Sequence, residues 1–527
     1  MVSRKQMKKE KRDKSEAPLR PPFQTGVIDI GAHSVRLDIY ELDRFWRMER
    51  LETLSRPLNL GTDVFRNGFI SAENVSKLLN IADRFREKLA EYDVGYFQVI
   101  ATSALREAFN KELIADRFRD IGMELEIIGG TNEATLTYQA AKEVLQDKCK
   151  NSLSRAVMLI LGSGSLFVIG IVNSLMCFCE EVPTGTMRIS DAIGNAAPPL
   201  EQLRESLKSL RILRRLDECM PAGKAGDTSL VIIGNTARKL ASLGGNAPGG
   251  DDDCAVFEYR EFGKLLKDCS SMEKKRFRKL DADETAELNS ACVIIEHFFE
   301  HNSFKDVICP GVTTRGALMK NWIRKQRNPA DEPFRADLAA VCSAVGKKYD
   351  FDAEHARCVA AASAKLYAKL HHCFSFPDNS ALLLEAAAYL HDIGRFVDIR
   401  KHQKHSWYLV ANTQLPGISD SEHRVIAAMV RYHGKSMPRE NHPEYSALSA
   451  SEKVAVLKLA AILRVADALD VGHEQDWKSI KCVLRGRIFY IIVEGADIVS
   501  KKYALKLKGG LFEQVFGLEL KIQDSEI

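Results

Sequence analysis

Two stretches of this chain, far apart in the sequence, share one pattern: an apolar strand, a short turn of small residues and a second apolar strand. The first stretch spans residues 27–42 and turns at Gly31, and the second spans residues 157–172 and turns at residues 162–165. A strand–turn–strand that recurs in this way indicates internal duplication of one supersecondary unit. The sequence therefore predicts two similar α/β lobes that face a cleft.

The spacing of apolar residues divides the chain further. Residues 24–150 and 151–330 alternate apolar runs with helical segments, as α/β lobes do, whereas residues 335–475 are rich in Ala and Leu at helical spacing. Residues 476–527 contain short alternating segments, at 482–484, 488–493, 504–508 and 518–522, which predict a small β-rich domain. Residues 1–23 are basic and lack an apolar segment, so we expect a disordered tail rather than a signal peptide.

Composition indicates an ordinary intracellular protein. Of the 527 residues 45% are hydrophobic and 28% charged, and the net charge of +4 gives no reason to expect a specific nucleic-acid partner. Twelve cysteines without a CxxC pair are typical of reduced thiols in the cytoplasm. The uncharged residues 156–179 are interrupted by Gly and Asn-Ser, so we expect a buried hairpin there and no membrane span.

Residues with metal-ligand chemistry recur in the helical part, where His391 and Asp392 are adjacent after an apolar run. Further candidates flank this pair in the order His, His-Asp, His, His, Asp: they are His355, His405, His433 and Asp467. Imidazole and carboxylate ligands suit a first-row metal or Mg²⁺, and such ions activate water against phosphate esters and anhydrides. We expect His355, His391, Asp392 and Asp467 to share one cation. For His405 and His433 a second cation and a metal-free hydrogen-bonded network are both open.

The first lobe carries candidates for a phosphate site. Asp29 ends an apolar strand just before Gly31 and Ser34, whose backbone N–H groups and hydroxyl can cradle phosphate oxygens while Asp29 holds a metal or its water. Arg106 follows an apolar strand near a predicted helix N-terminus, a favourable place for an anion. Glu133 lies in a predicted first helical turn, where it could align a water or simply favour the helix dipole. Taken alone, each motif also fits a plain turn or helix cap.

Together these segments resemble the Ppx/GppA family of exopolyphosphatases and guanosine pentaphosphate phosphatases, part of the actin-like ATPase superfamily. The matching segments are residues 27–31 with Ser34, 101–106 with Asn110, 126–134 and 185–188, followed by 384–394, 402–408 and 431–433. The resemblance implies two actin-like (ribonuclease H-like) lobes, then an all-α HD-type domain and a small β-rich C-terminal domain.

The resemblance also implies a function: release of the terminal phosphate from inorganic polyphosphate or from guanosine pentaphosphate (pppGpp), with Mg²⁺ or Mn²⁺ as cofactor. Guanosine tetraphosphate is a further possible ligand, and the implied assembly is a homodimer. Glu133 matches the family's catalytic glutamate, which orients or deprotonates the attacking water. Asp29 matches a carboxylate near the metal, and Arg106 a phosphate-contacting arginine. The phosphate-binding residues expected in the second lobe are Gly162, Ser163, Gly164, Ser165, Gly234 and Thr236.

The second lobe departs from the family's pattern Asp-(apolar)-Gly-Gly-Gly-Ser-x-Glu. Aligned on the flanking strands, Leu159 and Leu166 take the two acidic positions, and Pro310 and Arg315 stand where acidic residues are usual. Loss of carboxylates is expected to weaken metal binding and slow cleavage. Three functions stay open: a phosphatase acting through Glu133, a weakly catalytic or non-catalytic sensor of polyphosphate or pppGpp, and a phosphohydrolase that acts on a phosphorylated nucleotide at the HD centre.

Overall fold

The computed structural model describes residues 21–150, 152–186, 207–208, 211–220, 226–271, 282–328, 332–475, 479–494 and 498–524, so most of the expected basic tail lies outside it. The chain forms two units. The first contains the residues up to Ile128 and the segment that begins at Thr313, and the second contains Gly129–Val312 and the residues from Glu332 onward. The chain therefore leaves the first lobe at residue 128 rather than 150, and residues 313–328 belong to the first lobe rather than the second.

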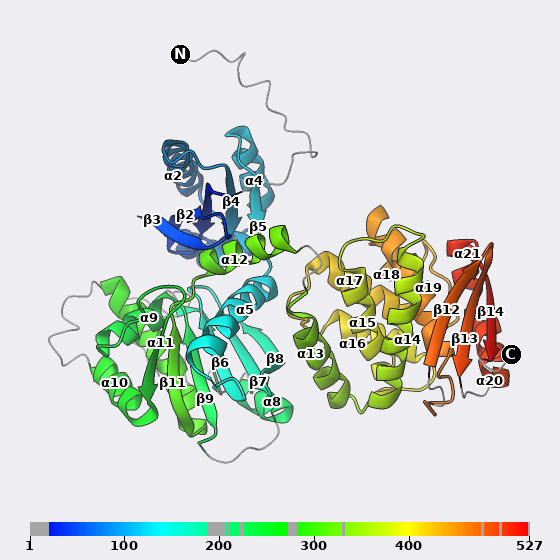
Figure 1. Cartoon of the computed structure of the whole chain (residues 1–527). Helices are drawn as coiled ribbons and strands as arrows, with labels where there is room; N and C mark the ends of the chain where they lie inside the picture. Colours follow the sequence, from blue (N-terminus) through cyan, green and yellow to red (C-terminus); the bar gives the residue numbers. More distant parts are fainter. Residues whose placement is uncertain are drawn as a thin grey trace, which may run out of the picture. The chain divides into compact units, whose positions relative to one another are not determined.

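The first unit is built around a five-stranded sheet in the order β3-β2-β1-β4-β5 (Figure 1). Its elements are β1 (Phe23–Ile30), β2 (Ser34–Leu42), β3 (Met48–Pro57), α1 (Leu60–Asn67), α2 (Ala72–Glu91), β4 (Tyr96–Ala101), α3 (Ser103–Glu107), α4 (Lys111–Asp120), β5 (Leu125–Ile127) and α12 (Thr314–Arg327). Strands β1 to β3 are antiparallel and β1, β4 and β5 are parallel. Helix α12 packs against β1, and its Trp322 stacks on Tyr96 at a centroid distance of 4.4 Å.

The second lobe repeats this topology. Its elements are α5 (Gly130–Lys148), β6 (Arg155–Leu161), β7 (Leu166–Val172), β8 (Leu175–Val182), α8 (Ile212–Cys219), β9 (Thr228–Ile233), α9 (Asn235–Leu243), β10 (Cys254–Glu258), α10 (Tyr259–Ser271), α11 (Ala282–His301) and β11 (Phe304–Pro310). Its sheet has the order β10-β11-β9-β6-β7-β8, in which β8-β7-β6-β9-β11 corresponds to β3-β2-β1-β4-β5. The shared strand order confirms the duplication that the repeated strand–turn–strand predicted.

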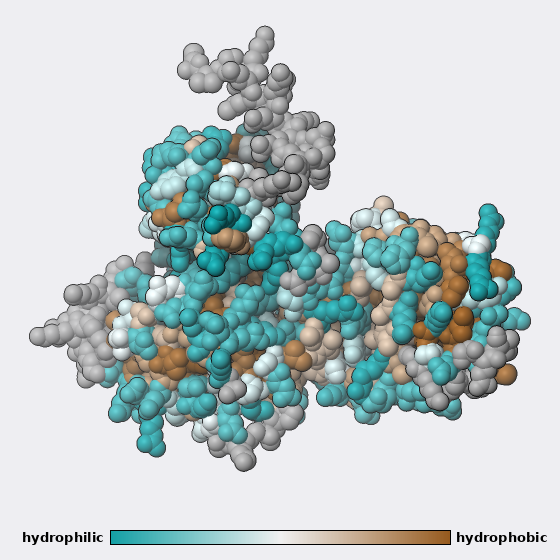
Figure 2. All heavy atoms as spheres, viewed as in Figure 1, coloured by the Kyte–Doolittle hydropathy of each residue, from teal (hydrophilic) through white to brown (hydrophobic). Residues whose placement is uncertain are grey.

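The uncharged segment 156–179 forms β6, β7 and the first part of β8 in the middle and at one edge of this sheet. It is a buried hairpin with a third strand, as the interrupting Gly and Asn-Ser residues indicated. None of the helices in the described ranges is long and apolar enough to cross a membrane. On the face shown in Figure 2 hydrophilic residues predominate and hydrophobic residues are gathered in separate groups.

Residues 335–475 are helical wherever they form regular structure. The helices are α13 (Arg335–Lys348), α14 (Ala353–His371), α15 (Ser380–Leu390), the short 3₁₀ helix η2 (Ile393–Phe396), α16 (His402–Ala411), α17 (Asp420–Arg431), α18 (Pro443–Ser446) and α19 (Ala450–Ala468). Capping boxes start α17, from Ser419 and Glu422, and α19, from Ser449 and Glu452. Apolar faces of α14, α15, α17 and α19 pack on one another, which fixes where their termini lie.

The C-terminal part contains β12 (Ser479–Arg485), β13 (Ile488–Glu494), α20 (Ile498–Lys508), α21 (Gly510–Phe516) and β14 (Glu519–Asp524), with a sheet in the order β12-β13-β14. Residues 504–508 were predicted as a strand, and this prediction was wrong because they end α20. Their alternation of Leu and Lys imitates a strand, but the neighbouring residues Ala504 and Leu505 are both buried, as one face of a helix requires. Helices α20 and α21 pack on α19.

A buried carboxylate joins the helical part to the second lobe. Asp337 of α13 accepts hydrogen bonds from Tyr138 Oη (2.7 Å) and Lys142 Nζ (2.9 Å) of α5 and from the backbone N–H of Met176 in β8 (2.8 Å). These donors satisfy both carboxylate oxygens, which makes burial of the charge tolerable.

We expect Asp337→Ala to lower the free energy of unfolding by about 3 kcal/mol, because it leaves a half-buried ammonium and a buried N–H without an acceptor. Urea denaturation measures this change. Glu354→Ala serves as the control, since Glu354 forms an exposed surface pair with Arg357 and such pairs contribute little. Equal stability of the two variants would contradict the structural role of Asp337.

Candidate functional site

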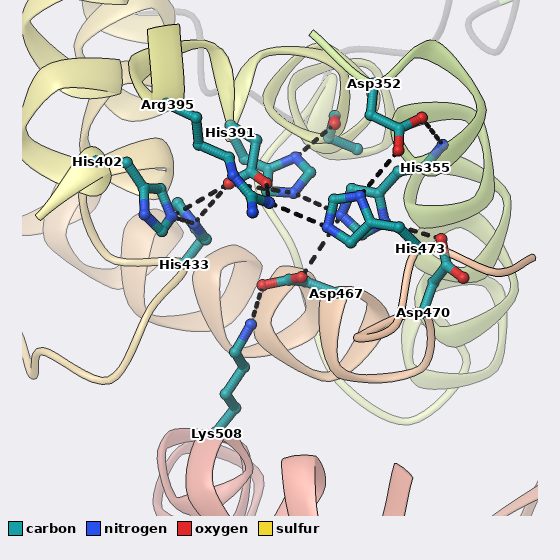
Figure 3. Close-up of polar contacts among 12 residues, drawn as sticks. Asp352, His355, His391, Arg395, His402, His433, Asp467, Asp470, His473 and Lys508 are labelled. Carbon is teal, nitrogen blue, oxygen red and sulfur yellow. Dashed lines mark hydrogen bonds and ion pairs between the residues drawn. The ribbon is translucent and has the colours of Figure 1, made fainter. Parts of the chain in front are cut away.

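Four helix termini of the helical part bring histidine and aspartate side chains to one place (Figure 3). His355 lies in the first turn of α14, whose N-cap Asp352 accepts hydrogen bonds from the backbone N–H groups of residues 354 and 355. His391 follows the last residue of α15, His433 follows the end of α17, and Asp467 lies in the last turn of α19. All but Asp352 are buried. Helix packing therefore converts residues spread over more than a hundred positions into one cluster.

His355, His391 and Asp467 form the first group with metal-ligand geometry, since their ligand atoms lie within 4.8 Å of one another. His355 Nε2 is 3.3 Å from His391 Nε2 and 3.7 Å from Asp467 Oδ1. The sequence predicted one site made of these three residues and Asp392. The structure brings the three together but does not place Asp392 in the same group.

Asp392, His402 and His433 form a second such group beside the first. Asp392 Oδ1 lies 3.1 Å from His402 Nε2, 3.5 Å from His433 Nε2 and 3.9 Å from His391 Nε2. The same carboxylate oxygen therefore faces both groups. This is the position of a ligand that two cations could share.

The four histidines are oriented by fixed hydrogen-bond acceptors. The acceptors of their Nδ1 atoms are Asp470 Oδ2 for His355 (2.8 Å) and the carbonyl oxygens of Ala388 for His391 (2.8 Å), Ile399 for His402 (3.1 Å) and Val430 for His433 (2.7 Å). Because these acceptors place a proton on Nδ1, each neutral ring presents a lone pair at Nε2. The Nε2 atoms nevertheless face each other in pairs, at 3.3 Å for His355 and His391 and at 3.2 Å for His402 and His433. Each pair of facing Nε2 atoms can hold a shared proton or a cation, and together with the carboxylates this donor set suits divalent transition metals.

Electrostatics at the cluster acts differently on its members. Burial alone would lower the pKa of His355 and His402, but hydrogen bonds to Asp470 and Asp392 raise it above the ordinary value. Burial lowers the pKa of His391 to about 4, so this imidazole is neutral near pH 7. Burial alone would raise the pKa of Asp392, but the neighbouring imidazoles, His391 first among them, hold it well below its usual range. Burial likewise opposes ionisation of Asp467, yet the ammonium of Lys508 lowers its pKa to about 2. The cluster thus combines ionised carboxylates with at least one neutral imidazole.

The structure replaces one predicted ligand: His402, and not His405, joins Asp392 and His433. Both histidines belong to α16, but His405 lies about 4.5 Å further along the helix axis and points about 60° away. Helix α16 begins close to Asp392 because Gly394 packs against it, and a side chain at Gly394 would clash with the backbone of His402 and Ser406. The glycine of the His-Asp-Ile-Gly motif therefore permits the approach that selects His402.

Residues that the sequence analysis did not identify surround the cluster. His473, in the loop after α19, stacks on the His355 ring at 3.7 Å and hydrogen-bonds Asp352 Oδ2 through its Nδ1 (2.9 Å). Arg395 of η2 donates to Asp392 Oδ2 (2.9 Å) and to His473 Nε2 (3.0 Å). Lys508 of α20 donates to Asp467 Oδ2. Asp470 could have been found from its position one turn after Asp467, but no local pattern marks Lys508.

In the first unit Asp29 is bound to an arginine of the same chain. Arg315 of α12, itself buried, donates from Nη1 to Asp29 Oδ2 (3.2 Å) and from Nε to Asp38 Oδ2 (2.6 Å). Burial raises the pKa of Asp29 although Arg315 opposes this rise, and Asp29 Oδ1 has no hydrogen-bond partner among the described residues. Arg315 already supplies a positive charge beside Asp29, and among the described residues Asp29 belongs to no group of three or more potential metal ligands.

The other predicted residues of the first unit lie in the elements expected for them. Gly31 and Ser34 close the β1–β2 turn, with Gly31 N–H donating to Ser34 O at 3.0 Å. Arg106 of α3 donates from Nη1 to the carbonyl oxygen of Ile128 (3.0 Å), directly after strand β5. Arg106 is therefore already bound to backbone that leads into the second unit.

The small-residue loop of the second lobe forms a tight turn. Gly162 N–H donates to Ser165 O at 2.9 Å, which closes the turn that contains Ser163 and Gly164. Gly234 precedes α9 with φ of 134°, and a side chain there would clash with the carbonyl oxygen of residue 161. Residues 234–236, with the buried Thr236, therefore begin α9 directly beside the end of β6. Of the segment 185–188, residues 187 and 188 lie outside the described ranges.

Glu133 lies in the first turn of α5, as predicted, and is partly buried. A second carboxylate, that of Glu181 in β8, lies at the same helix N-terminus. It is so close to Gly130 that a side chain at this position would clash with it. A helix N-terminus attracts anions. The carboxylate of Glu181 therefore already lies at the N-terminus of the helix that carries Glu133.

The register of the second lobe corrects the positions of its missing carboxylates. Gly162 closes its turn with the hydrogen bond that Gly31 makes in the first lobe, so Ile160 corresponds to Asp29. Read from this glycine, the family pattern places its acidic residues at Ile160 and Phe167, which are cross-strand partners. Leu159 and Leu166 are one residue out of register and belong to the buried core between the sheet and its helices. In this chain, therefore, both positions at which the family pattern has an acidic residue carry an apolar one.

Comparison with known proteins identifies relatives along most of the chain. Residues 39–325 match the model of the Ppx/GppA phosphatase family, and residues 339–495 match Ppx/GppA phosphatase, domain III. A guanosine-5'-triphosphate,3'-diphosphate pyrophosphatase of Photobacterium profundum is 21% identical over 470 residues, which cover 87% of this chain and 88% of that protein. Exopolyphosphatase 1 of Mycobacterium bovis is 23% identical over 331 residues, covering 61% and 94%. The crystal structure of an exopolyphosphatase from Cytophaga hutchinsonii superposes with a TM-score of 0.49 at 19% identity, covering 57% and 97%.

Proposed function

The chain belongs to the Ppx/GppA phosphatase family, and from this premise we propose that it is a phosphohydrolase whose hydrolytic centre is the histidine–aspartate cluster of the helical part. We propose that this part is an HD-type domain. The substrates we propose are pppGpp or inorganic polyphosphate, in keeping with the names of its relatives.

One observation carries the proposed location: four imidazoles turn their Nε2 atoms toward one another and toward the two carboxylates Asp392 and Asp467. Imidazole nitrogens and carboxylate oxygens gathered in this way are the donor set that divalent transition metals take. The residues that would hold one cation are His355, His391 and Asp467, and those that would hold a second are Asp392, His402 and His433.

The N-terminal lobes give weaker support for hydrolysis. Arg315 already neutralises Asp29, and Ile160 and Phe167 offer no ligand atom where the family has carboxylates. Phosphoryl transfer requires neutralisation of the charge on the phosphate oxygens as well as a positioned water. Glu133 alone can serve only the second requirement.

Divalent cations at the cluster would supply Lewis acidity and a water of lowered pKa. The protein's own contribution is orientation and charge. The Nδ1 hydrogen bonds hold each imidazole in one tautomer, and burial keeps His391 neutral. Asp392 adds negative charge where both groups meet, which favours two cations over one.

A second candidate function, which the Gly162–Ser165 turn favours, is phosphate binding by the N-terminal lobes without efficient cleavage. This turn and the residues that begin α9 keep closely packed backbone and two buried hydroxyl side chains, Ser165 and Thr236. Backbone N–H groups in such loops bind phosphate without a carboxylate or a metal. The lobes would then sense the anion that the helical domain hydrolyses.

Metal analysis tests the proposed centre. We expect the full chain, stripped by chelation and reloaded with Mn²⁺, to bind about two metal ions and to release phosphate from pppGpp or polyphosphate only in the loaded form. His402→Ala is expected to bind about one ion fewer, because it removes a ligand of the second group. Elemental analysis after gel filtration gives the stoichiometry.

His405→Ala is the matched control, since this histidine lies on the same helix outside both groups. It is expected to keep the metal content of the wild type. Loss of metal from His405→Ala and not from His402→Ala would reverse our assignment. A wild-type chain that binds no Mn²⁺ yet releases phosphate would place the activity elsewhere.

A further inference from the structure

We propose that Arg395 and Lys508 form a receptor for the terminal phosphate of the substrate, so that the C-terminal domain completes the site in the helical domain. This inference rests on the proposed function at the histidine–aspartate cluster. It adds to that function a residue from α20, an element that supplies no candidate metal ligand.

Lys508 reaches the cluster from the last residue of α20, and its ammonium donates to Asp467 Oδ2 (Figure 3). The side chain keeps 19% of its surface exposed, whereas that of Asp467 keeps 8%. Helix α20 packs on α19, the helix that carries Asp467. The C-terminal domain therefore places a partly accessible cation directly beside a candidate metal ligand.

Arg395 supplies the second cation from η2, next to the His-Asp pair. Its Nη1 donates to Asp392 Oδ2 at 2.9 Å and to His473 Nε2 at 3.0 Å, and its side chain is 43% exposed. His473 accepts this hydrogen bond because its Nδ1 is paired with Asp352 Oδ2. Arg395 is thus positioned by two neighbours but remains open to a ligand from solvent.

Both cations bind the carboxylate oxygen that the candidate metal groups do not use. Asp467 turns Oδ1 toward His355 (3.7 Å) and Oδ2 toward Lys508, and Asp392 turns Oδ1 toward His402 (3.1 Å) and Oδ2 toward Arg395. Neither cation therefore displaces a metal. Each stands next to the place where phosphate oxygens would meet the metal ions.

The chemistry of the pair favours a terminal phosphate. A terminal phosphoryl group carries close to two negative charges near neutral pH, whereas a phosphodiester carries one. An arginine and a lysine match the doubly charged group, since arginine binds two phosphate oxygens in a planar fork and lysine acts as a point charge.

Binding of inorganic phosphate to the full chain tests this inference. By isothermal titration of the Mn²⁺-loaded protein, we expect Lys508→Met and Arg395→Met each to weaken phosphate binding about tenfold, because each removes one charge-assisted contact. The Mn²⁺ content and the melting temperature are expected to stay close to wild type. KM for the substrate should rise with a smaller change in kcat, and Lys508→Arg should retain most of the binding. Lys506→Met, an exposed neighbour on α20, is the control and should bind phosphate as the wild type does.

Parallel titration of the metal-free protein measures phosphate bound outside the cluster. If Lys508→Met and Lys508→Arg lose Mn²⁺ or melt earlier while their loaded fraction binds phosphate normally, the two cations are structural and the receptor is refuted. If all variants bind phosphate equally, the receptor is likewise refuted, although the hydrolytic centre stands if it still requires Mn²⁺. If phosphate binding and hydrolysis are both indifferent to Mn²⁺ and to Asp392→Ala, the proposed function itself fails.

Discussion

Replacing Asp392 with alanine is expected to lower kcat/KM for phosphate release by about a thousandfold, which corresponds to about 4 kcal/mol of transition-state stabilisation. Asp392 Oδ1 faces the imidazoles of His391, His402 and His433, and alanine removes the negative charge that offsets two cations at this point. We therefore expect the variant to lose metal as well as activity. Colorimetric phosphate release from pppGpp and polyphosphate, with metal content determined on the same samples, measures both changes.

Comparison of Asp392→Ala with Glu133→Gln shows which of the two sites hydrolyses the substrate. Glu133→Gln removes the carboxylate that the family resemblance assigns to catalysis while keeping the size of the side chain in the first turn of α5. We expect this variant to retain most of the wild-type rate. Survival of activity in Asp392→Ala together with its loss in Glu133→Gln would return the reaction to the N-terminal lobes.

Replacing Arg315 with methionine is expected to lower the stability of the first unit by about 3–5 kcal/mol. The guanidinium is buried against Asp38 at 2.6 Å and Asp29 at 3.2 Å, and methionine would leave both carboxylates without this cation. Asp38 keeps hydrogen bonds from Tyr40 and Thr53 and a longer ion pair with Arg50 (3.9 Å), which balance its charge only in part. Hydrogen exchange across β1 and β2, measured by mass spectrometry, reports the loss.

The triple variant Arg315→Met, Asp29→Asn, Asp38→Asn controls for lost packing, because it removes the cation and both charges together. It should recover most of the lost stability, since replacing a whole buried ionic group costs less than breaking it. If the single variant Arg315→Met were instead stable and bound Mg²⁺, Arg315 would be a simple substitute for a metal. The interpretation of this lobe as a metal-independent site would then be wrong.

Local sequence patterns determined the architecture of this protein. The repeated strand–turn–strand predicted two lobes, and both sheets have the corresponding strand order because each apolar strand needs a neighbour to bury it. Helical spacing of Ala and Leu predicted the α13–α19 region. The adjacent His391 and Asp392 identified the cluster, since a His-Asp pair at a helix end offers two ligands whatever the helix packs against.

Local sequence patterns named the wrong residue where the outcome depended on how helices and strands approach each other. His402 and His405 are equally plausible in sequence, and only the contact of Gly394 with α16 selects His402. The missing carboxylates were placed one residue out of register, at Leu159 instead of Ile160, because strand burial on both faces hides the alternation that would reveal the register.

The partners of the carboxylates were decided by tertiary structure alone. Arg315 meets Asp29 across 286 positions and Lys508 meets Asp467 across 41, and neither cation carries a local signal that names its partner. A charged side chain looks the same in sequence whether it faces solvent or a buried acid. Packing of α12 on β1 and of α20 on α19 places these cations, and this packing decides which carboxylates can hold a metal and which are already neutralised.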